Sequence, residues 1–148
     1  MIAVDTNILV YAHVDTFPKH PAAKEALIEL AEGGRMWGIP SPCLVEFMRV
    51  ATHPRVFTDP FSVSDVTEAL DALLAAPTVS ILGPGEQHWA FLRDGARAAD
   101  ARGNLAFDAA IAAICEEVGV TQLLTEDRDF DRFASLSTLR LADFLERA

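Results

Sequence analysis

Residues 1–10 read MIAVDTNILV. The apolar run from Ile2 to Val4 predicts a short strand buried on both faces, and Asp5 is the first charged residue after it. Apolar residues then recur at helical spacing from Ile8, so Asp5 falls at a strand-to-helix turn. Open α/β sheets bind ligands in the crevice at the carboxyl ends of their strands, and this turn belongs there. The simpler alternative is that Asp5 only caps the helix.

The rest of the chain alternates strands with helices, within what we expect to be one domain spanning residues 1–148. Proline and glycine mark the breaks between segments. The patterns predict strands at 36–39, 79–82, 121–125 and 138–141, and helices at 22–32, 43–52, 64–76, 89–102 and 108–118 before a terminal helical turn. This order predicts an α/β fold, with a mostly parallel sheet of four to five strands and helices on both faces.

Composition excludes several classes of protein. The 148 residues are 51% hydrophobic, which excludes a disordered chain. No apolar run reaches the roughly 20 residues of a membrane helix, and the sequence opens on a core strand instead of a leader, so we expect a cytoplasmic protein with no membrane association. Cys43 and Cys115 belong to no metal-binding motif and are expected to be buried free thiols.

The net charge of −10 argues against contact with nucleic acid, because phosphate groups are held by Lys and Arg. The objection weakens if some of the 22 acidic residues converge on one pocket. Divalent cations bound there would cancel local charge and present a positive centre to a phosphate.

Two further acidic residues lie on predicted helices. Glu46 projects opposite the apolar stripe of its helix, but the flanks are apolar too, so its side chain is expected to be partly enclosed. An ion pair with Arg49 is the alternative for Glu46. Asp108 opens a helix, where a structural role at the cap is the alternative. Asn104 can take the capping role instead and release Asp108.

A fourth acidic element follows the strand at 121–125, in the stretch LLTEDRDF. Asp127 stands just beyond a buried strand, in the same topological position as Asp5. Four acidic residues at strand ends and on helices can therefore meet in one crevice. Oxygen ligands select Mg²⁺ or Mn²⁺, and such ions activate water and stabilise charge on phosphate oxygens, so the natural chemistry is phosphodiester hydrolysis.

No other catalytic motif competes with this interpretation. The chain has neither a phosphate-binding Gly-x-x-x-x-Gly-Lys loop nor a Gly-x-Ser-x-Gly elbow. Its four histidines lack paired ligand spacing and are assigned to loops and helix ends: His13, His20, His53 and His88.

Four blocks of the sequence, in order, resemble a known family. They are MIAVDTNILVYA, SPCLVEFMRVATHPRVF, GNLAFDAAIAAI and LLTEDRDF. Together they are similar to the blocks of PIN-domain ribonucleases, specifically VapC-type toxins of toxin–antitoxin pairs. The resemblance implies metal-binding, catalytic carboxylates at Asp5, Glu46, Asp108 and Asp127.

The resemblance also implies an activity and partners. Thr6 would be the hydroxyl neighbour of the first carboxylate, and Asp129 can share or replace the role of Asp127. Members of this family cleave RNA endonucleolytically with one or two Mg²⁺ or Mn²⁺ ions, are inhibited by a cognate VapB antitoxin, and usually form homodimers. A non-catalytic PIN-like module that binds RNA or a partner is the main alternative. A phospho-receiver domain fits less well, because Asp-Thr-Asn follows the first strand and no Lys follows Lys24.

Because the protein is so acidic overall, RNA would have to be bound by local clusters of basic side chains. Two pairs of arginines are candidates, one on the predicted helix at 89–102 and one flanking Glu46: Arg93 and Arg97, Arg49 and Arg55. Ordinary solvated surface is the alternative for all four.

Overall fold

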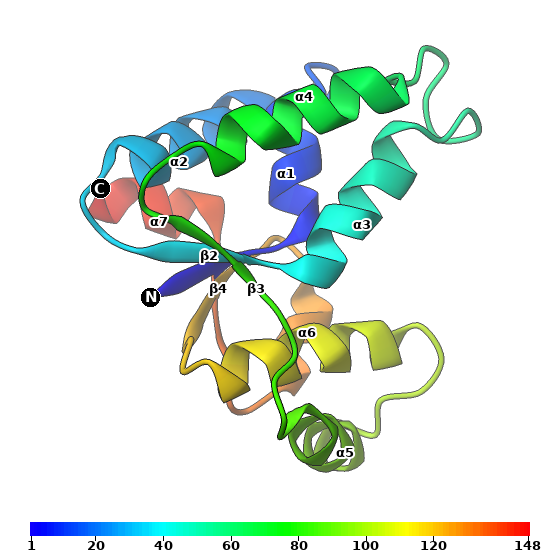
Figure 1. Cartoon of the computed structure of the whole chain (residues 1–148), viewed down its shortest axis with the longest axis vertical. Coiled ribbons are helices and arrows are strands. Elements are labelled where there is room, and N and C mark those ends of the chain that lie inside the picture. Colours follow the sequence, from blue (N-terminus) through cyan, green and yellow to red (C-terminus); the bar gives the residue numbers. More distant parts are fainter.

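The computed structural model describes all 148 residues, built around one sheet of five parallel strands (Figure 1). The strand order is β3-β2-β1-β4-β5. The strands are β1 (Ile2–Val4), β2 (Trp37–Pro40), β3 (Val79–Leu82), β4 (Gln122–Leu124) and β5 (Ser137–Leu139). The α/β fold and the parallel sheet expected from the sequence are therefore confirmed.

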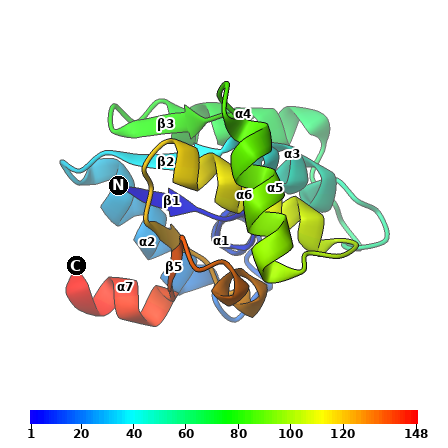
Figure 2. The ribbon, with the colours of Figure 1, turned by 90° about the horizontal axis from the view of Figure 1, so that it is seen from below.

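Helices cover both faces of the sheet. One face carries α1, α2, α4 and α7, and the other carries α5 and α6, which lie in front of the sheet in Figure 2. The helices are α1 (Thr6–His13), α2 (His20–Glu32), α3 (Ser41–Ala51), α4 (Val63–Leu74), α5 (His88–Ala99), α6 (Leu105–Glu117) and α7 (Leu141–Arg147), with a 3₁₀ helix η1 (Arg128–Arg132) after β4. No helix has the length and apolarity to cross a membrane.

The central strands are short, and both of their faces are buried. Every residue of β2 is buried, and Ala3 and Val4 of β1 are fully enclosed. A Cβ atom at Gly38 would lie 2.6 Å from Cγ of Leu82 on the neighbouring strand, so any other residue there requires the Leu82 side chain to move. Near-continuous apolar runs of this kind are expected of a parallel sheet covered on both sides.

Two predicted helix boundaries are wrong by a few residues. Helix α5 ends at Ala99 instead of 102, because Asp100 adopts a left-handed conformation with φ of 48° and stops it. Helix α6 begins at Leu105, three residues before the predicted start, just after Gly103 turns the chain with φ of 58°. Asp108 therefore lies inside the first turn of α6 and not at its cap.

The strand order decides where a ligand can bind. The chain passes from β1 to β2 on one side, and later places β4 on the other side of β1. The crevice outside the carboxyl ends of β1 and β4 is thus the topological switch point of the sheet, the usual ligand site of such folds. Asp5 follows β1 and Thr125 follows β4, so both residues stand at this crevice.

Candidate active site

Asp5 lies at the carboxyl end of β1 and is buried, with 4% of its surface exposed. Its Oδ1 accepts a hydrogen bond from the Thr6 backbone N–H at 2.7 Å and one from the Cys43 thiol at 3.7 Å. Its Oδ2 accepts from the Thr125 hydroxyl at 2.7 Å and from the Asn7 side-chain amide at 3.1 Å. Asp5 thus caps α1, as the simpler alternative has it, and is also fixed by three side chains from three different elements.

Asn7 and Thr125 tie the ends of β1 and β4 together. The Asn7 amide donates to the Thr125 hydroxyl oxygen at 3.2 Å, and the Asn7 carbonyl oxygen accepts from the Glu126 backbone N–H at 3.3 Å. The hydroxyl of Thr125, which is fully buried, also accepts from the Asp127 backbone N–H at 3.0 Å. This network couples the position of Asp5 to that of Asp127, although the two lie at opposite ends of the sequence.

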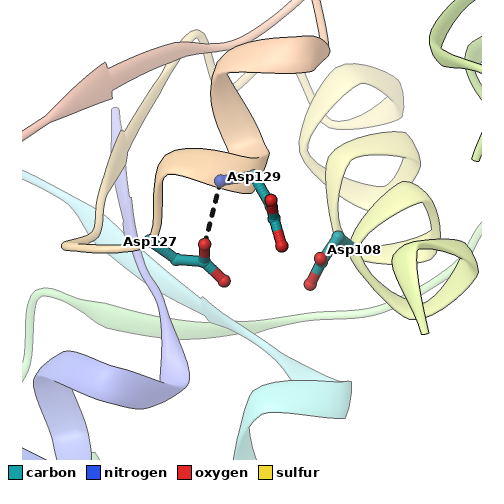
Figure 3. Close-up of side chains that lie close together, drawn as sticks. All are labelled: Asp108, Asp127 and Asp129. Atoms are coloured by element: carbon teal, nitrogen blue, oxygen red, sulfur yellow. Dashed lines mark hydrogen bonds between the residues drawn. The ribbon is translucent and has the colours of Figure 1, made fainter.

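Three carboxylates meet at the mouth of the crevice: Asp108 from the first turn of α6, and Asp127 and Asp129 from the start of η1 (Figure 3). One oxygen from each lies within 4.8 Å of the others. Asp127 Oδ1 accepts the Asp129 backbone N–H at 2.9 Å, which fixes the turn that presents both side chains. Asp127 and Asp129 both belong to this group, so either carboxylate, or both, is placed to act as a ligand.

The electrostatics of this group show an uncompensated negative charge. Burial, followed by the charges of Asp127, Asp5, Asp129 and Glu46, raises the pKa of Asp108 to about 7. Burial also raises the pKa of Asp5, against the hydrogen bonds it accepts. No Lys, Arg or His side chain pairs with Asp108, Asp127 or Asp129. Carboxylates gathered without a basic partner form a donor set suited to a hard divalent cation.

Glu46 is near this group but not part of it. Its Oε1 lies 2.6 Å from the Arg49 guanidinium, one turn along α3, and its side chain is 45% exposed. The ion pair considered as the alternative is therefore present, and the side chain of Glu46 is partly enclosed, as expected. Its charge still contributes to the raised pKa of Asp108, so Glu46 lies within electrostatic range of the group.

Arg140 holds the segment that carries Asp127 and Asp129. Its Nη1 donates to the backbone carbonyls of Thr125 and Asp127 at 2.8 and 3.2 Å. Its Nη2 donates to both carboxylate oxygens of Asp131 at 3.1 and 3.0 Å. Arg140 precedes α7 and carries no sequence signal for this role, because its partners lie in a separate element.

Glu126 lies between two residues of the site, Thr125 and Asp127, but has partners of its own. It pairs with Lys19 and accepts the Leu141 backbone N–H at 2.8 Å. Burial acts to raise the pKa of Glu126, but these two bonds hold it below its ordinary value. The partners explain why this carboxylate does not join the acidic group.

The two cysteines and four histidines singled out in the sequence lie outside the acidic group. Both cysteines are free and buried, as expected, and burial raises the pKa of Cys115 to about 12. Nδ1 of His13 and Nδ1 of His20 lie 2.7 and 2.8 Å from backbone carbonyls, of Leu9 and Tyr11 respectively. His53 Nδ1 accepts the Arg55 backbone N–H at 3.1 Å, and His88 begins α5. None of the four histidines belongs to the acidic group.

The four candidate arginines have different surroundings. Arg49 is paired with Glu46, and Arg93 is paired with Asp94 at 2.9 Å. Arg55 lies exposed in the segment after α3, and Arg97 lies exposed on α5.

Comparison with known proteins identifies the family. The model of the family described as PIN domain matches residues 2–136, so the chain belongs to the PIN-domain family. Ribonuclease VapC43 of Mycobacterium tuberculosis is 44% identical over 136 residues, 92% of each chain, and this places the chain among the VapC proteins of that family.

Solved structures support the same fold. The crystal structure of VapBC2 from Rickettsia felis, bound to a DNA fragment from its promoter, contains a chain similar to this one with a TM-score of 0.69 and 20% identity, covering 95% of this chain and 98% of that one. Mycobacterium tuberculosis VapC20, described as a sarcin–ricin loop cleaving toxin, gives a TM-score of 0.66 at 17% identity, covering 93% and 99%.

Proposed function

We propose that this protein is a divalent-metal-dependent endoribonuclease and the toxin of a type II toxin–antitoxin pair. The observation that carries the proposal is the group formed by Asp108, Asp127 and Asp129, three carboxylates without a basic partner at the switch point of the sheet. Relatives that match nearly the whole chain are named as ribonucleases, which fits a site of this chemistry.

Mg²⁺ or Mn²⁺ is the cofactor that the donor set fits. Asp108, Asp127 and Asp129 would hold it, with Asp5 close to them and Glu46 joining them after leaving Arg49. A divalent cation bound to carboxylates supplies water activation and charge stabilisation on the attacked phosphate. The buried Asp5 network keeps the carboxyl end of β1 rigid, and Arg140 keeps the turn carrying Asp127 and Asp129 in place. The RNA is then cut by in-line attack of water on the scissile phosphate.

The partners follow from the relatives. A VapB-type antitoxin is the proposed inhibitor, since the R. felis structure is of a VapBC complex. A basic side chain of the antitoxin can enter the acidic crevice, because a guanidinium pairs bidentately with carboxylates. A homodimer in the cytoplasm is the proposed working form of the free toxin.

A cleavage assay on the purified chain tests the proposal. We expect wild type to cut RNA with Mg²⁺ or Mn²⁺, to stop after chelation, and to resume when the metal is restored. Asp5→Asn keeps the shape of the buried side chain but removes its charge, and we expect it to lose about 10- to 100-fold in rate, the usual effect of disturbing groups around a metal. Equal cutting by wild type and Asp5→Asn, or by neither, would favour the non-catalytic module.

A further inference from the structure

A second hollow lies directly beside the acidic group. Its volume is about 430 Å³, and its lining is almost entirely polar: Asp100, Arg102, Asn104, Leu105, Asp129 and Arg132. Asp129 belongs both to this hollow and to the acidic group, so the two sites share a wall. The other lining residues come from the turn between α5 and α6 and from the end of η1.

Two arginines enter this hollow from different elements. Arg132 ends η1 and has no acidic partner. Arg102 lies 2.9 Å from Asp100, but both side chains are more than 70% exposed. An exposed ion pair contributes about 0–1 kcal/mol, so a phosphate can replace Asp100 as the partner of Arg102 at little cost.

Polar groups other than charges complete the lining. Asn104 occupies the capping position of α6, yet its side chain makes no capping bond, which leaves its amide free to donate. Guanidinium and amide N–H groups are the donors that bind phosphate oxygens. A cation bound by the acidic group would offset the charge of Asp129 and leave the two arginines dominant.

Resting on the proposed function, we infer that this hollow binds the RNA backbone phosphate next to the scissile one, through Arg132 and Arg102. The RNA strand then runs from the acidic group past Asp129 towards the turn between α5 and α6. Phosphate binding is thereby assigned to two arginines that are not among the four candidates expected from the sequence. Because phosphates carry no base identity, the hollow contributes affinity and register but no sequence preference.

Salt dependence of RNA binding tests this inference. Binding of a fluorescent single-stranded RNA is measured by anisotropy from 50 mM to 1 M salt, with Ca²⁺ as the divalent ion and the RNA verified as intact by gel. Each lost phosphate contact reduces the slope of log K against log salt by about 0.7. If the variants bind equally at 1 M salt, this slope change corresponds to about eightfold weaker binding at 50 mM salt. We expect this loss for Arg132→Gln, and a slope change of about 1.4 for Arg132→Gln combined with Arg102→Gln.

Arg35→Gln is the matched control. Arg35 is exposed and has no acidic partner. It precedes β2 and so lies at the amino ends of the strands, opposite the carboxyl ends where the acidic group is found. Its removal lowers the net charge equally, and we expect a wild-type slope. The inference is overturned if wild type binds and cleaves RNA while both hollow variants keep its slope, or if Arg35→Gln weakens binding as much as they do. A wild type that neither binds nor cleaves RNA overturns the proposed function instead.

Discussion

Replacing Asp108 with asparagine should make the metal-free protein more stable while removing its capacity for metal. In the absence of a cation, burial of this half-buried carboxylate, followed by the charges of Asp127, Asp5, Asp129 and Glu46, raises its pKa to about 7. The unfolded chain has the ordinary value of 3.8. Between these two values the native state binds more protons than the unfolded state, so stability falls as pH rises.

The magnitude follows from the same pKa values. Each pKa unit between 3.8 and about 7 corresponds to about 1.4 kcal/mol, which gives a full penalty of about 4 kcal/mol above pH 7. Solvent screens a half-buried group, and we expect about 1–2 kcal/mol of this penalty to be realised. Asparagine has no charge at any pH. Asp108→Asn should therefore be about 1–2 kcal/mol more stable than wild type at pH 8 and similar to it at pH 4, without metal.

Thermal or urea unfolding in the presence of a chelator measures this difference. For a chain of this length, 1–2 kcal/mol corresponds to about 2–8 °C in Tm. Adding Mn²⁺ at 100 times its Kd should stabilise wild type by about 2.7 kcal/mol, and most of this gain should be absent in Asp108→Asn. Asp71→Asn is the control, because Asp71 lies exposed on α4 and makes no side-chain bond.

Two results would refute this reasoning. One is an Asp108→Asn protein that is less stable than wild type at pH 8 without metal, which would mean that the carboxylate is stabilising. The other is a stability difference that does not grow between pH 5 and pH 8, or that Asp71→Asn reproduces. Taking the difference between variant and wild type removes the opposite contribution of Glu126, whose pKa is lowered and whose stabilisation is lost only as pH falls.

Three further substitutions test the supports of the site. Thr125→Val removes the hydroxyl that donates to Asp5, and should lower the free energy of unfolding by about 1–3 kcal/mol in urea titration. Arg140→Met releases the backbone of the segment that carries Asp127, and should weaken Mn²⁺ binding about 10- to 100-fold by calorimetry. Gly38→Ala places a Cβ atom 2.6 Å from the Leu82 side chain, and should cost about 1–3 kcal/mol of stability in the same titration.

Each of these substitutions has a control in the same chain. Thr67→Val removes an exposed hydroxyl that bonds only to carbonyls of its own helix, and should be nearly neutral. Arg147→Met removes an exposed arginine of α7 that has no acidic partner and should leave Mn²⁺ affinity unchanged. Gly34→Ala adds a methyl group with no atom within 4 Å. Effects of equal size in a substitution and its control would show that the contacts named above are not the cause.

The sequence was sufficient for the sheet and for the location of the crevice. Buried parallel strands are short, apolar and separated by helical patterns, so their ends could be read from the first charged or hydroxyl residue that follows each. Asp5 was placed at the end of β1 in this way, whereas Asp127, which follows Thr125 and Glu126, was singled out by the resemblance of LLTEDRDF to the last block of the family. Asp108 was found because it opens an apolar helix, although the start of that helix was misplaced by three residues.

The residues that hold the site in place could not be predicted from the sequence, because their contacts join parts of the chain that are far apart. Asn7 and Thr125 are 118 residues apart, and Arg140 acts on carbonyls of another element, so no local spacing signals either contact. The pair of Glu46 with Arg49 is three residues apart on one helix and was foreseeable for that reason. The arginines of the second hollow come together only through the packing of η1 against α6.

Anomalous diffraction from a crystal of this protein soaked in Mn²⁺ tests the central claim most directly. We expect a peak among Asp108, Asp127 and Asp129, with oxygen ligands at about 2.0–2.2 Å, and no such peak in Asp108→Asn crystals treated identically. A wild-type crystal with no peak at these three carboxylates, at a Mn²⁺ concentration that supports RNA cleavage, would contradict the account.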